Sequence, residues 1–330
     1  MSQPRITGTE RLTAAQVAGV LAAADAAAAA DAVAPLSEHV LLHMRDDSAE
    51  DDGGARVPAR EFLLTVDGET AGYAHLDLPV PGPDAGGELV VHPARRGQGL
   101  GRALVGELTV AAGGHVLRLW AHGDLPAAAG LAARTGFERF RALWQMRRPL
   151  RGRLDEPRLP AGHTLRTFVP GQDEDEWVSL NGRAFAKHPE QGAWTRHDLE
   201  LREREPWFDP AGLFIAEAGG RMTGFHWTKV HQGGEPDLGG NREDRLGEVY
   251  VLGVDPAGQG SGLGRALTLA GLRYLRGLGL AEVMLYADED NGPAIRMYEA
   301  LGFTRTRTDA MYRRPPRRPR GDDPPASPGG

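Results

Sequence analysis

A glycine-rich junction occurs twice in this chain, and this repeat limits what the chain can fold into. Residues 89–104 read LVVHPARRGQGLGRAL and residues 252–267 read LGVDPAGQGSGLGRAL, 163 positions later. Aligned without a gap, the two stretches agree at 11 of 16 positions, which chance does not produce. Duplication of a whole folding unit is therefore the first hypothesis.

The repeat extends beyond the glycine residues. Residues 61–78 and 213–230 each alternate β-forming residues around a short turn, which predicts a β-hairpin in each half. The second hairpin is followed by a longer polar stretch, residues 231–247, which we expect to be a surface loop. Each glycine loop is followed by a predicted helix, a short strand and a second helix that ends on Gly-Phe. The predicted helices and strands cover residues 101–112 and 116–122 in the first half and residues 264–278 and 282–288 in the second.

The length of the chain fits two such units. At roughly 150 residues per domain, 330 residues correspond to about two domains. We expect a first domain over residues 1–150, which includes an alanine-rich helix at 21–34, and a second over 151–312. The Pro- and Arg-rich residues 147–162 are predicted to link them. Residues 313–330 carry a similar composition and are predicted to form a disordered tail.

Charge and composition exclude several classes of protein. A formal net charge of −7 argues against nucleic acid or an anionic membrane as the main partner. No apolar run approaches the roughly 20 residues that span a bilayer, and the N-terminus has no signal-peptide pattern, so we expect a cytoplasmic protein. The chain has no cysteine, which excludes disulfides, thiol nucleophiles and Cys-based metal sites, and no metal site is predicted. Two fused halves also suggest a monomer.

The glycine loop itself predicts a ligand. A strand that ends in alternating glycines and opens into a helix presents several backbone N–H groups at a helix N-terminus, where phosphate or pyrophosphate binds. A Walker loop requires a lysine that neither copy contains. A dinucleotide-binding fingerprint requires a third glycine at the position of Arg265. Neither of these two loop types therefore fits.

Both copies instead match Arg/Gln-x-x-Gly-x-Gly, with Arg96 or Gln259 at its first position. Together with LGVDP before the second loop and NGPAIRMYEALGF after it, this motif resembles the GNAT superfamily of N-acetyltransferases, which bind the pyrophosphate of acetyl-CoA. The resemblance covers nearly all of both halves. It implies an α/β fold of two tandem GNAT-like domains, each a mixed twisted sheet flanked by helices.

The resemblance implies acetyl-CoA as the acetyl donor and suggests which residues bind it. In the second half, one segment aligns the thioester, the glycine loop holds the pyrophosphate and a third segment flanks the cofactor. These residues are Leu252, Gly253, Val254, Gln259, Gly260, Ser261, Gly262, Leu263, Gly264, Arg265, Asn291, Gly292, Pro293, Ala294, Ile295 and Arg296. The corresponding residues of the first half are Leu89, Val90, Val91, Arg96, Gly97, Gly99, Gly101 and Arg102.

The two halves differ in the groups that catalysis needs. An α-amine with a pKa of about 8 is mostly protonated at neutral pH, so its acetylation benefits from a base. Glu248 lies on the strand that enters the second loop, and strand alternation predicts that Glu248, Tyr250 and Leu252 share a face near the thioester. At the same offset the first half has Ala85, and alternation places Glu88 on the opposite face. The alternative for Glu248 is a surface glutamate at the start of a strand.

Tyr298 occupies the position from which, by the resemblance, this family protonates the departing CoA thiolate. The alternative is an aromatic packing residue, and the first half offers only Leu131 or Ala132 at this position. We therefore predict that the second half catalyses and that the first binds acetyl-CoA without turnover. The expected mechanism is direct attack of the amine on the thioester, because a chain without cysteine cannot form a thiol-linked acyl-enzyme.

The acceptor is suggested by the whole architecture, including RAFAKHPEQGAW at residues 183–194. It resembles the tandem actinobacterial members of the family that act in mycothiol biosynthesis, which acetylate the cysteinyl amine of a cysteinyl-glucosaminyl-inositol. The resemblance implies acceptor contacts from Glu38, Glu190, Lys229, Glu248 and Tyr286. An acetyltransferase for another amine, such as an aminoglycoside or a protein N-terminus, and a non-catalytic acetyl-CoA-binding protein remain alternatives.

Overall fold

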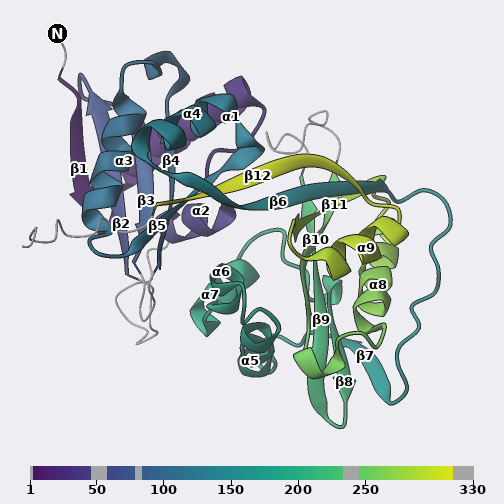
Figure 1. Cartoon of the computed structure of the whole chain (residues 1–330). Coiled ribbons are helices and arrows are strands. Elements are labelled where there is room, and N and C mark those ends of the chain that lie inside the picture. The colour runs from purple at the N-terminus through teal and green to yellow at the C-terminus, as the bar shows by residue number, and fades with distance from the viewer. Residues whose placement is uncertain (1–2, 46–57, 79–83, 233–244, 315–330) are drawn as a thin grey trace, which may run out of the picture.

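The computed structural model describes residues 3–45, 58–78, 84–232 and 245–314, except the side chains of residues 189 and 190. Within these residues, two halves of similar architecture share one sheet of twelve strands (Figure 1). With the strands numbered along the chain, their order in the sheet is 1-2-3-4-5-12-6-11-10-9-8-7. The fold is therefore α/β with a mixed sheet, as the sequence predicts.

Within the described residues, the elements of the two halves follow the same order, except that the second half has one more helix between its first two strands. The first half contains β1 (Arg5–Thr9), α1 (Ala14–Asp31), α2 (Glu38–Arg45), β2 (Ala59–Val66), β3 (Glu69–Asp77), β4 (Asp84–Val91), α3 (Leu100–Ala111), β5 (Val116–Ala121), α4 (Pro126–Thr135) and β6 (Glu138–Pro149). The second half contains β7 (His163–Thr167), α5 (Glu174–Ala184), α6 (Pro189–Gly192), α7 (Arg196–Glu203), β8 (Leu213–Ala218), β9 (Arg221–His231), β10 (Leu246–Val254), α8 (Leu263–Gly277), β11 (Glu282–Asp288), α9 (Gly292–Ala300) and β12 (Thr304–Arg314). Both predicted hairpins are present, as β2–β3 and β8–β9.

Three boundaries differ from the sequence prediction. Helix α1 begins earlier than predicted because Thr13 and Gln16 form a capping box. The predicted linker is wrong at its start, since residues 147–149 pair with β11 as the end of β6. The predicted tail is wrong at its first two residues, which complete β12. Residues 315–330 and most of the predicted loop at 231–247 lie outside the described residues.

The closing strands of the two halves are exchanged. Strand β6, from the first half, pairs with β11 of the second, and β12 pairs with β5 of the first (Figure 1). Tyr312 of β12 is accordingly buried in the first-half core, whereas Met146 of β6 is buried in the second. The boundary at residue 150 thus divides the repeated sequence but not the sheet, and the domain bounds stay a prediction.

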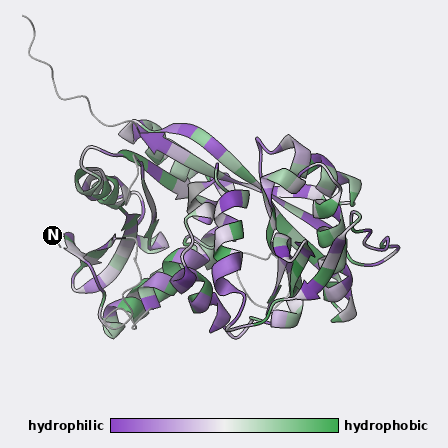
Figure 2. Cartoon of the chain, turned by 90° about the horizontal axis from the view of Figure 1, so that it is seen from below, coloured by the Kyte–Doolittle hydropathy of each residue, from purple (hydrophilic) through white to green (hydrophobic). Residues whose placement is uncertain are grey.

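Each half has a hydrophobic core on both faces of its part of the sheet. In the first half, one core includes Leu104 of α3 and the other includes Val20 of α1. In the second half, one core includes Leu272 of α8 and the other Trp177 of α5. Hydrophilic and hydrophobic residues are interleaved along these elements, as expected where one face packs on a core and the other meets water (Figure 2). Among the described helices, none has the length and apolarity required to cross a membrane.

Candidate active site

Each half has one pair of parallel strands, and the two strands of each pair separate partway along their length. Strand β10 pairs with β11 only from Gly247 to Val249, although it continues to pair with β9 as far as Val254. Strand β4 likewise pairs with β5 only up to Gly87, although it continues beside β3 to Val91. Residues 252–254 and 89–91 therefore have one backbone edge without a strand partner among the described residues. An extended amide chain such as pantetheine can add to such an edge.

Both glycine loops have a conformation that requires glycine. Gly260 and Gly262 have φ values of 80° and 89°, in the left-handed region that disfavours side chains. Gly262 is the N-cap of α8 and provides no side-chain cap; the Leu263 N–H donates to the Ser261 hydroxyl at 3.4 Å, and the next backbone N–H groups of the helix remain available to an anion. Gly97 and Gly99 repeat this geometry before α3. Both loops thus fit a pyrophosphate.

Arg96 at the first loop and Arg265 at the second already have carboxylate partners. The guanidinium of Arg96 contacts both carboxylate oxygens of Asp31, each at 2.7 Å. Arg265 donates to Asp155 at 3.0 Å, and both residues line a pocket of ≈ 500 Å³ beside the second loop. The segment after residue 150, predicted only as a linker, therefore lies beside the predicted pyrophosphate site.

A β-bulge changes which residues of β10 share a face. Val249 lies opposite Thr228 and Val251 lies opposite Trp227, so Tyr250 is an extra residue between them. Tyr250 and Val251 consequently both pack on the core beneath α5 and α7. Leu252 packs instead on the core beneath α8. The prediction that Leu252 shares a face with Glu248 and Tyr250 is wrong, because one inserted residue reverses the alternation.

The bulge also changes the comparison between the halves. Glu248 lies opposite Lys229, and the matching position of the first hairpin, Asp77, lies opposite Gly86. Gly86 rather than Ala85 is therefore the structural counterpart of Glu248, and the first half still has no carboxylate there.

The prediction that Glu88 lies on the opposite face is also wrong. Strand β4 has no register shift, so Glu88 shares a face with Val90, which packs beneath α1 and α2 as Val251 packs beneath α5 and α7. Glu88 is buried and already bound: Oε2 accepts from the Ser37 backbone N–H at 2.6 Å, and Oε1 lies 3.6 Å from His122 Nε2. Its carboxylate is therefore part of a buried polar contact of the first half.

Glu248 is buried beside a histidine that the sequence analysis did not select. Its Oε2 lies 2.7 Å from Nε2 of His231, which is also buried. A buried imidazole next to a carboxylate can orient it and share a proton with it, which suits a general base. The sequence signal was present: His231 follows Lys229 by two residues and so lies on the same face of β9.

A residue from the first half completes this region. Glu38 of α2 binds Lys229 Nζ through Oε1 at 2.5 Å and accepts a hydrogen bond from the Tyr250 hydroxyl through Oε2 at 2.6 Å. Arg202 donates to the same hydroxyl at 2.8 Å. Burial alone would raise the pKa of Glu38, but Lys229 and Arg202 outweigh it and lower that pKa. The structure therefore brings together Glu38 and Lys229, two of the predicted acceptor contacts. Tyr250 and Arg202 join them in the same hydrogen-bonded group, which the sequence did not predict.

The remaining predicted residues lie in different surroundings. The hydroxyl of Tyr286 accepts hydrogen bonds from Gln145 and Arg307, at 3.0 Å and 3.1 Å, both from the exchanged strands. Glu190 lies on α6, and its side chain is outside the described part of the chain. Asn291 caps α9 by accepting from the Ala294 N–H at 3.2 Å.

Tyr298 is a buried residue of the second core. Its ring packs edge-on against Phe303, with 5.7 Å between centroids, and burial raises the pKa of its hydroxyl. The hydroxyl has no hydrogen-bond partner within the described residues. The phenol is therefore neutral and a weaker acid than a free tyrosine, and its ring has the packing role that the sequence left as an alternative.

Comparisons with known proteins place the chain in a family. The model of the acetyltransferase (GNAT) family matches residues 176–303, and that of the acetyltransferase (GNAT) domain matches residues 58–139. A curated protein from Thermomonospora curvata, named mycothiol acetyltransferase, is 54% identical over 317 residues, which cover 96% of this chain and 99% of the relative. Another of that name, from Thermobispora bispora, is 57% identical over 89% of this chain and 95% of its own. The chain belongs to the mycothiol acetyltransferase family.

Membership of this family confirms that the chain is an N-acetyltransferase built from two GNAT domains. Solved structures show the same fold over nearly the whole chain. A tandem GNAT protein from the clavulanic acid biosynthesis pathway has a TM-score of 0.67 at 23% identity, covering 94% of this chain and 98% of that one. A GCN5-related N-acetyltransferase from Sphaerobacter thermophilus has a TM-score of 0.62 at 25% identity, covering 94% and 95%. The roles of individual site residues stay predictions.

Proposed function

We propose that this chain transfers the acetyl group of acetyl-CoA to the cysteinyl amine of cysteinyl-glucosaminyl-inositol, giving mycothiol and CoA. The names of the relatives, at 50% identity or more over nearly the full length, support this acceptor. The observation that carries the chemistry is the buried contact between His231 of β9 and Glu248 of β10, the strand whose later backbone edge is open. Strand β10 thus carries both the proposed base, Glu248, and the open backbone edge that would align the thioester.

Acetyl-CoA binds along β10, the second glycine loop and the start of α9. The open edge at Leu252, Gly253 and Val254 pairs with pantetheine, and the uncapped N-terminus of α8 holds the pyrophosphate. The first half offers the same edge and loop, which supports binding of a second acetyl-CoA there. It lacks a carboxylate at Gly86, so this second site binds without turnover.

The reaction proceeds by direct attack. Glu248, oriented by His231, takes a proton from the acceptor ammonium, directly or through a water. The free amine attacks the thioester carbonyl, so that a C–N bond forms and the C–S bond breaks. Tyr298, a neutral phenol, gives its proton to the departing thiolate and is reprotonated by the second proton that the nitrogen releases as the amide forms. The proton on Glu248 passes to solvent, so the ammonium and acetyl-CoA give the amide, CoA and one released proton without a covalent acyl-enzyme.

The acceptor lies between the halves, against Glu38, Lys229, Glu248 and Tyr286, with Glu190 from α6. Carboxylates favour the ammonium, and the charged and phenolic groups provide hydrogen bonds for a glucosamine and a polyol. The Lys229–Glu38 ion pair supports this arrangement, because it joins the two halves next to Glu248 in the register of β9 and β10. We further propose that the enzyme acts as a monomer in the cytoplasm, where acetyl-CoA is made and used.

Mass spectrometry of the product formed from acetyl-CoA and the cysteinyl pseudodisaccharide tests this function. We expect one added acetyl group, on the amine. An aminoglycoside and a peptide N-terminus serve as competing acceptors under the same conditions. Turnover of either competitor without turnover of the pseudodisaccharide would overturn the proposed acceptor. Absence of acetyl-CoA binding, together with absence of turnover of all three acceptors, would overturn acetyl-CoA as the donor.

A further inference from the structure

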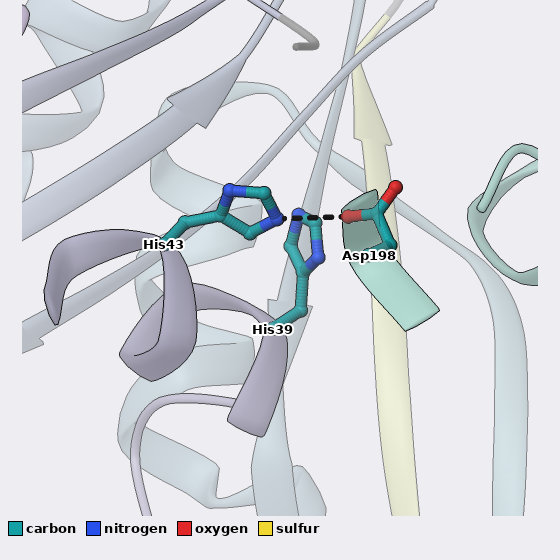
Figure 3. A group of neighbouring side chains, drawn as sticks. All are labelled: His39, His43 and Asp198. Atoms are coloured by element: carbon teal, nitrogen blue, oxygen red, sulfur yellow. Dashed lines mark hydrogen bonds and ion pairs between the residues drawn. The ribbon is translucent and has the colours of Figure 1, made fainter. Parts of the chain in front are cut away.

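Two histidines and an aspartate meet at the junction between the halves, in a position that the proposed reaction does not use. His39 and His43 project from α2 of the first half, and Asp198 faces them from α7 of the second (Figure 3). One potential ligand atom from each of the three lies within 4.8 Å of those from the other two. The group combines imidazole nitrogens with a carboxylate oxygen, which is the donor set that zinc prefers in a cysteine-free protein.

The spacing of the histidines suits a metal ion. His39 and His43 are four residues apart on one helix, so their side chains lie on the same face, the arrangement by which paired histidines on a helix bind zinc. Their ring centroids are 4.3 Å apart with the planes tilted by 57°, so the rings are not stacked face to face. His43 is buried, and the side chain of His39 is 33% exposed. The buried ring of His43 is thus held in the interior, whereas the ring of His39 is accessible to an ion from solvent.

The carboxylate of Asp198 is held so that one oxygen points at the histidines. Its Oδ2 accepts hydrogen bonds from the backbone N–H of Thr195 at 2.8 Å and from its hydroxyl at 2.7 Å. The other oxygen, Oδ1, lies 3.1 Å from Nε2 of His43. At zinc–ligand distances of about 2.0–2.2 Å, neighbouring ligand atoms of a tetrahedral site lie roughly 3.3–3.5 Å apart. The existing separation is therefore close to what coordination requires.

A second layer of polar groups surrounds the cluster. Nε2 of His39 lies 3.2 Å from Oδ2 of Asp77, whose other oxygen lies 2.9 Å from Nε2 of the buried His75. His75 in turn contacts Glu61 through Nδ1 at 3.1 Å. Carboxylates that accept a hydrogen bond from a metal-bound imidazole orient the ring and strengthen the ligand. Asp77 is placed to do this for His39.

We propose that His39, His43 and Asp198 bind a divalent transition-metal cation of the zinc class between the two halves. Each histidine gives one ring nitrogen and Asp198 gives Oδ1, which leaves one tetrahedral position for water. On binding, Nε2 of His43 presents its lone pair, and the hydrogen bond between His43 and Asp198 is replaced by two bonds to the ion. The ion then fastens α2 to α7. The sequence predicted no metal, because Asp198 lies 155 positions from His43 and nothing local connects them.

The test is a metal titration of the full-length protein after treatment with a chelator. Co²⁺ binding is followed by visible absorption and Zn²⁺ binding by calorimetry. We expect one ion per chain and a rise of a few degrees in melting temperature with excess Zn²⁺. His39→Gln should weaken Zn²⁺ binding by at least about tenfold. Because the ring of His39 is partly exposed, this substitution should leave the protein folded. His115→Gln, at an exposed histidine outside the cluster, is the matched control and should bind as wild type.

Asp198→Asn keeps the size of the side chain and should also abolish the zinc-dependent rise in melting temperature. The melting temperature without metal shows whether this variant still folds, since Asp198 also caps α7. The absence of binding at one ion per chain, or equal binding by wild type and His39→Gln, would overturn the proposal. So would binding that survives both His43→Gln and Asp198→Asn, which would place the ion on His39, His75 and Asp77 instead.

Discussion

Replacement of Glu248 by glutamine removes the proposed base and little else. Glutamine has nearly the same size, and its amide can still hydrogen-bond Nε2 of His231, which lies 2.7 Å from the carboxylate. Glu248 is buried within a paired part of β10, so the substitution leaves the packing and the strand pairing intact. What the variant loses is the ability to accept the ammonium proton.

The expected loss is large. A positioned general base contributes about 10²–10⁴ in rate, which corresponds to roughly 3–5 kcal/mol of activation free energy. We expect kcat to fall by this factor for Glu248→Gln, while the dissociation constant for acetyl-CoA changes little, because the strand edge and the glycine loop are untouched. Product formation is measured by mass spectrometry under saturating substrates, and acetyl-CoA binding by calorimetry.

A second variant separates a base from a residue that only positions the acceptor. Glu248→Asp keeps a carboxylate at this position and should retain more of the wild-type kcat than Glu248→Gln, which cannot accept a proton. Glu107→Gln, at an exposed position of α3, is the matched control and should behave as wild type. An unchanged kcat for Glu248→Gln, or a kcat for Glu248→Asp no higher than that of Glu248→Gln, would refute the assignment of Glu248 as the base.

Three other substitutions test the site and the junction. His231→Gln should lower kcat by less than Glu248→Gln and leave the KM for acetyl-CoA unchanged, because His231 acts through Glu248; an unchanged kcat in steady-state assays would contradict this role. Gly262→Ala, at a φ of 89°, should lower the free energy of unfolding by about 1–3 kcal/mol and weaken acetyl-CoA binding in calorimetry. The control Gly106→Ala, within helix α3, should leave the free energy of unfolding unchanged or raise it. Equal effects of the two substitutions would contradict the requirement for glycine in the loop. Burial by itself lowers the pKa of His122, but the nearby carboxylates outweigh burial and raise this pKa from 6.5 to about 10. The charged form of His122 therefore stabilises the fold. This stabilisation is complete below pH 6.5 and is lost as the pH rises to about 10. Urea unfolding across that range should show a larger loss in the wild type than in His122→Gln, which keeps the similar contribution of His75, and parallel curves for the two proteins would refute it.

Much of the cofactor site could be predicted from local sequence. The left-handed glycines of each loop and the helix that begins at Gly262 depend on short-range sterics and hydrogen bonds, which a few neighbouring residues determine. The hairpin turns at Asp67–Gly68 and Gly219–Gly220 have the same origin. Such features repeat in both halves because the same short pattern repeats.

The face on which a strand residue lies could be predicted only in part. Alternation assumes an unbroken register, and the extra residue at Tyr250 reverses it for Leu252. A bulge depends on the neighbouring strand, β9, and no residue in LGEVYVLGV indicates where it occurs. For the same reason the counterpart of Glu248 is displaced from Ala85 to Gly86.

The sequence by itself determined the repeat, the glycine cradle in each copy and the presence of Glu248 in the second copy at a position where the first copy has no carboxylate. Only the tertiary structure decided what surrounds that carboxylate. Glu38 reaches Lys229 across 191 positions and Tyr250 across 212, and β6 and β12 exchange between the halves. Contacts at such separations depend on how whole elements pack. Because the two copies have similar strand propensities, the residues of β6 and β12 do not by themselves indicate which half each of these strands will join.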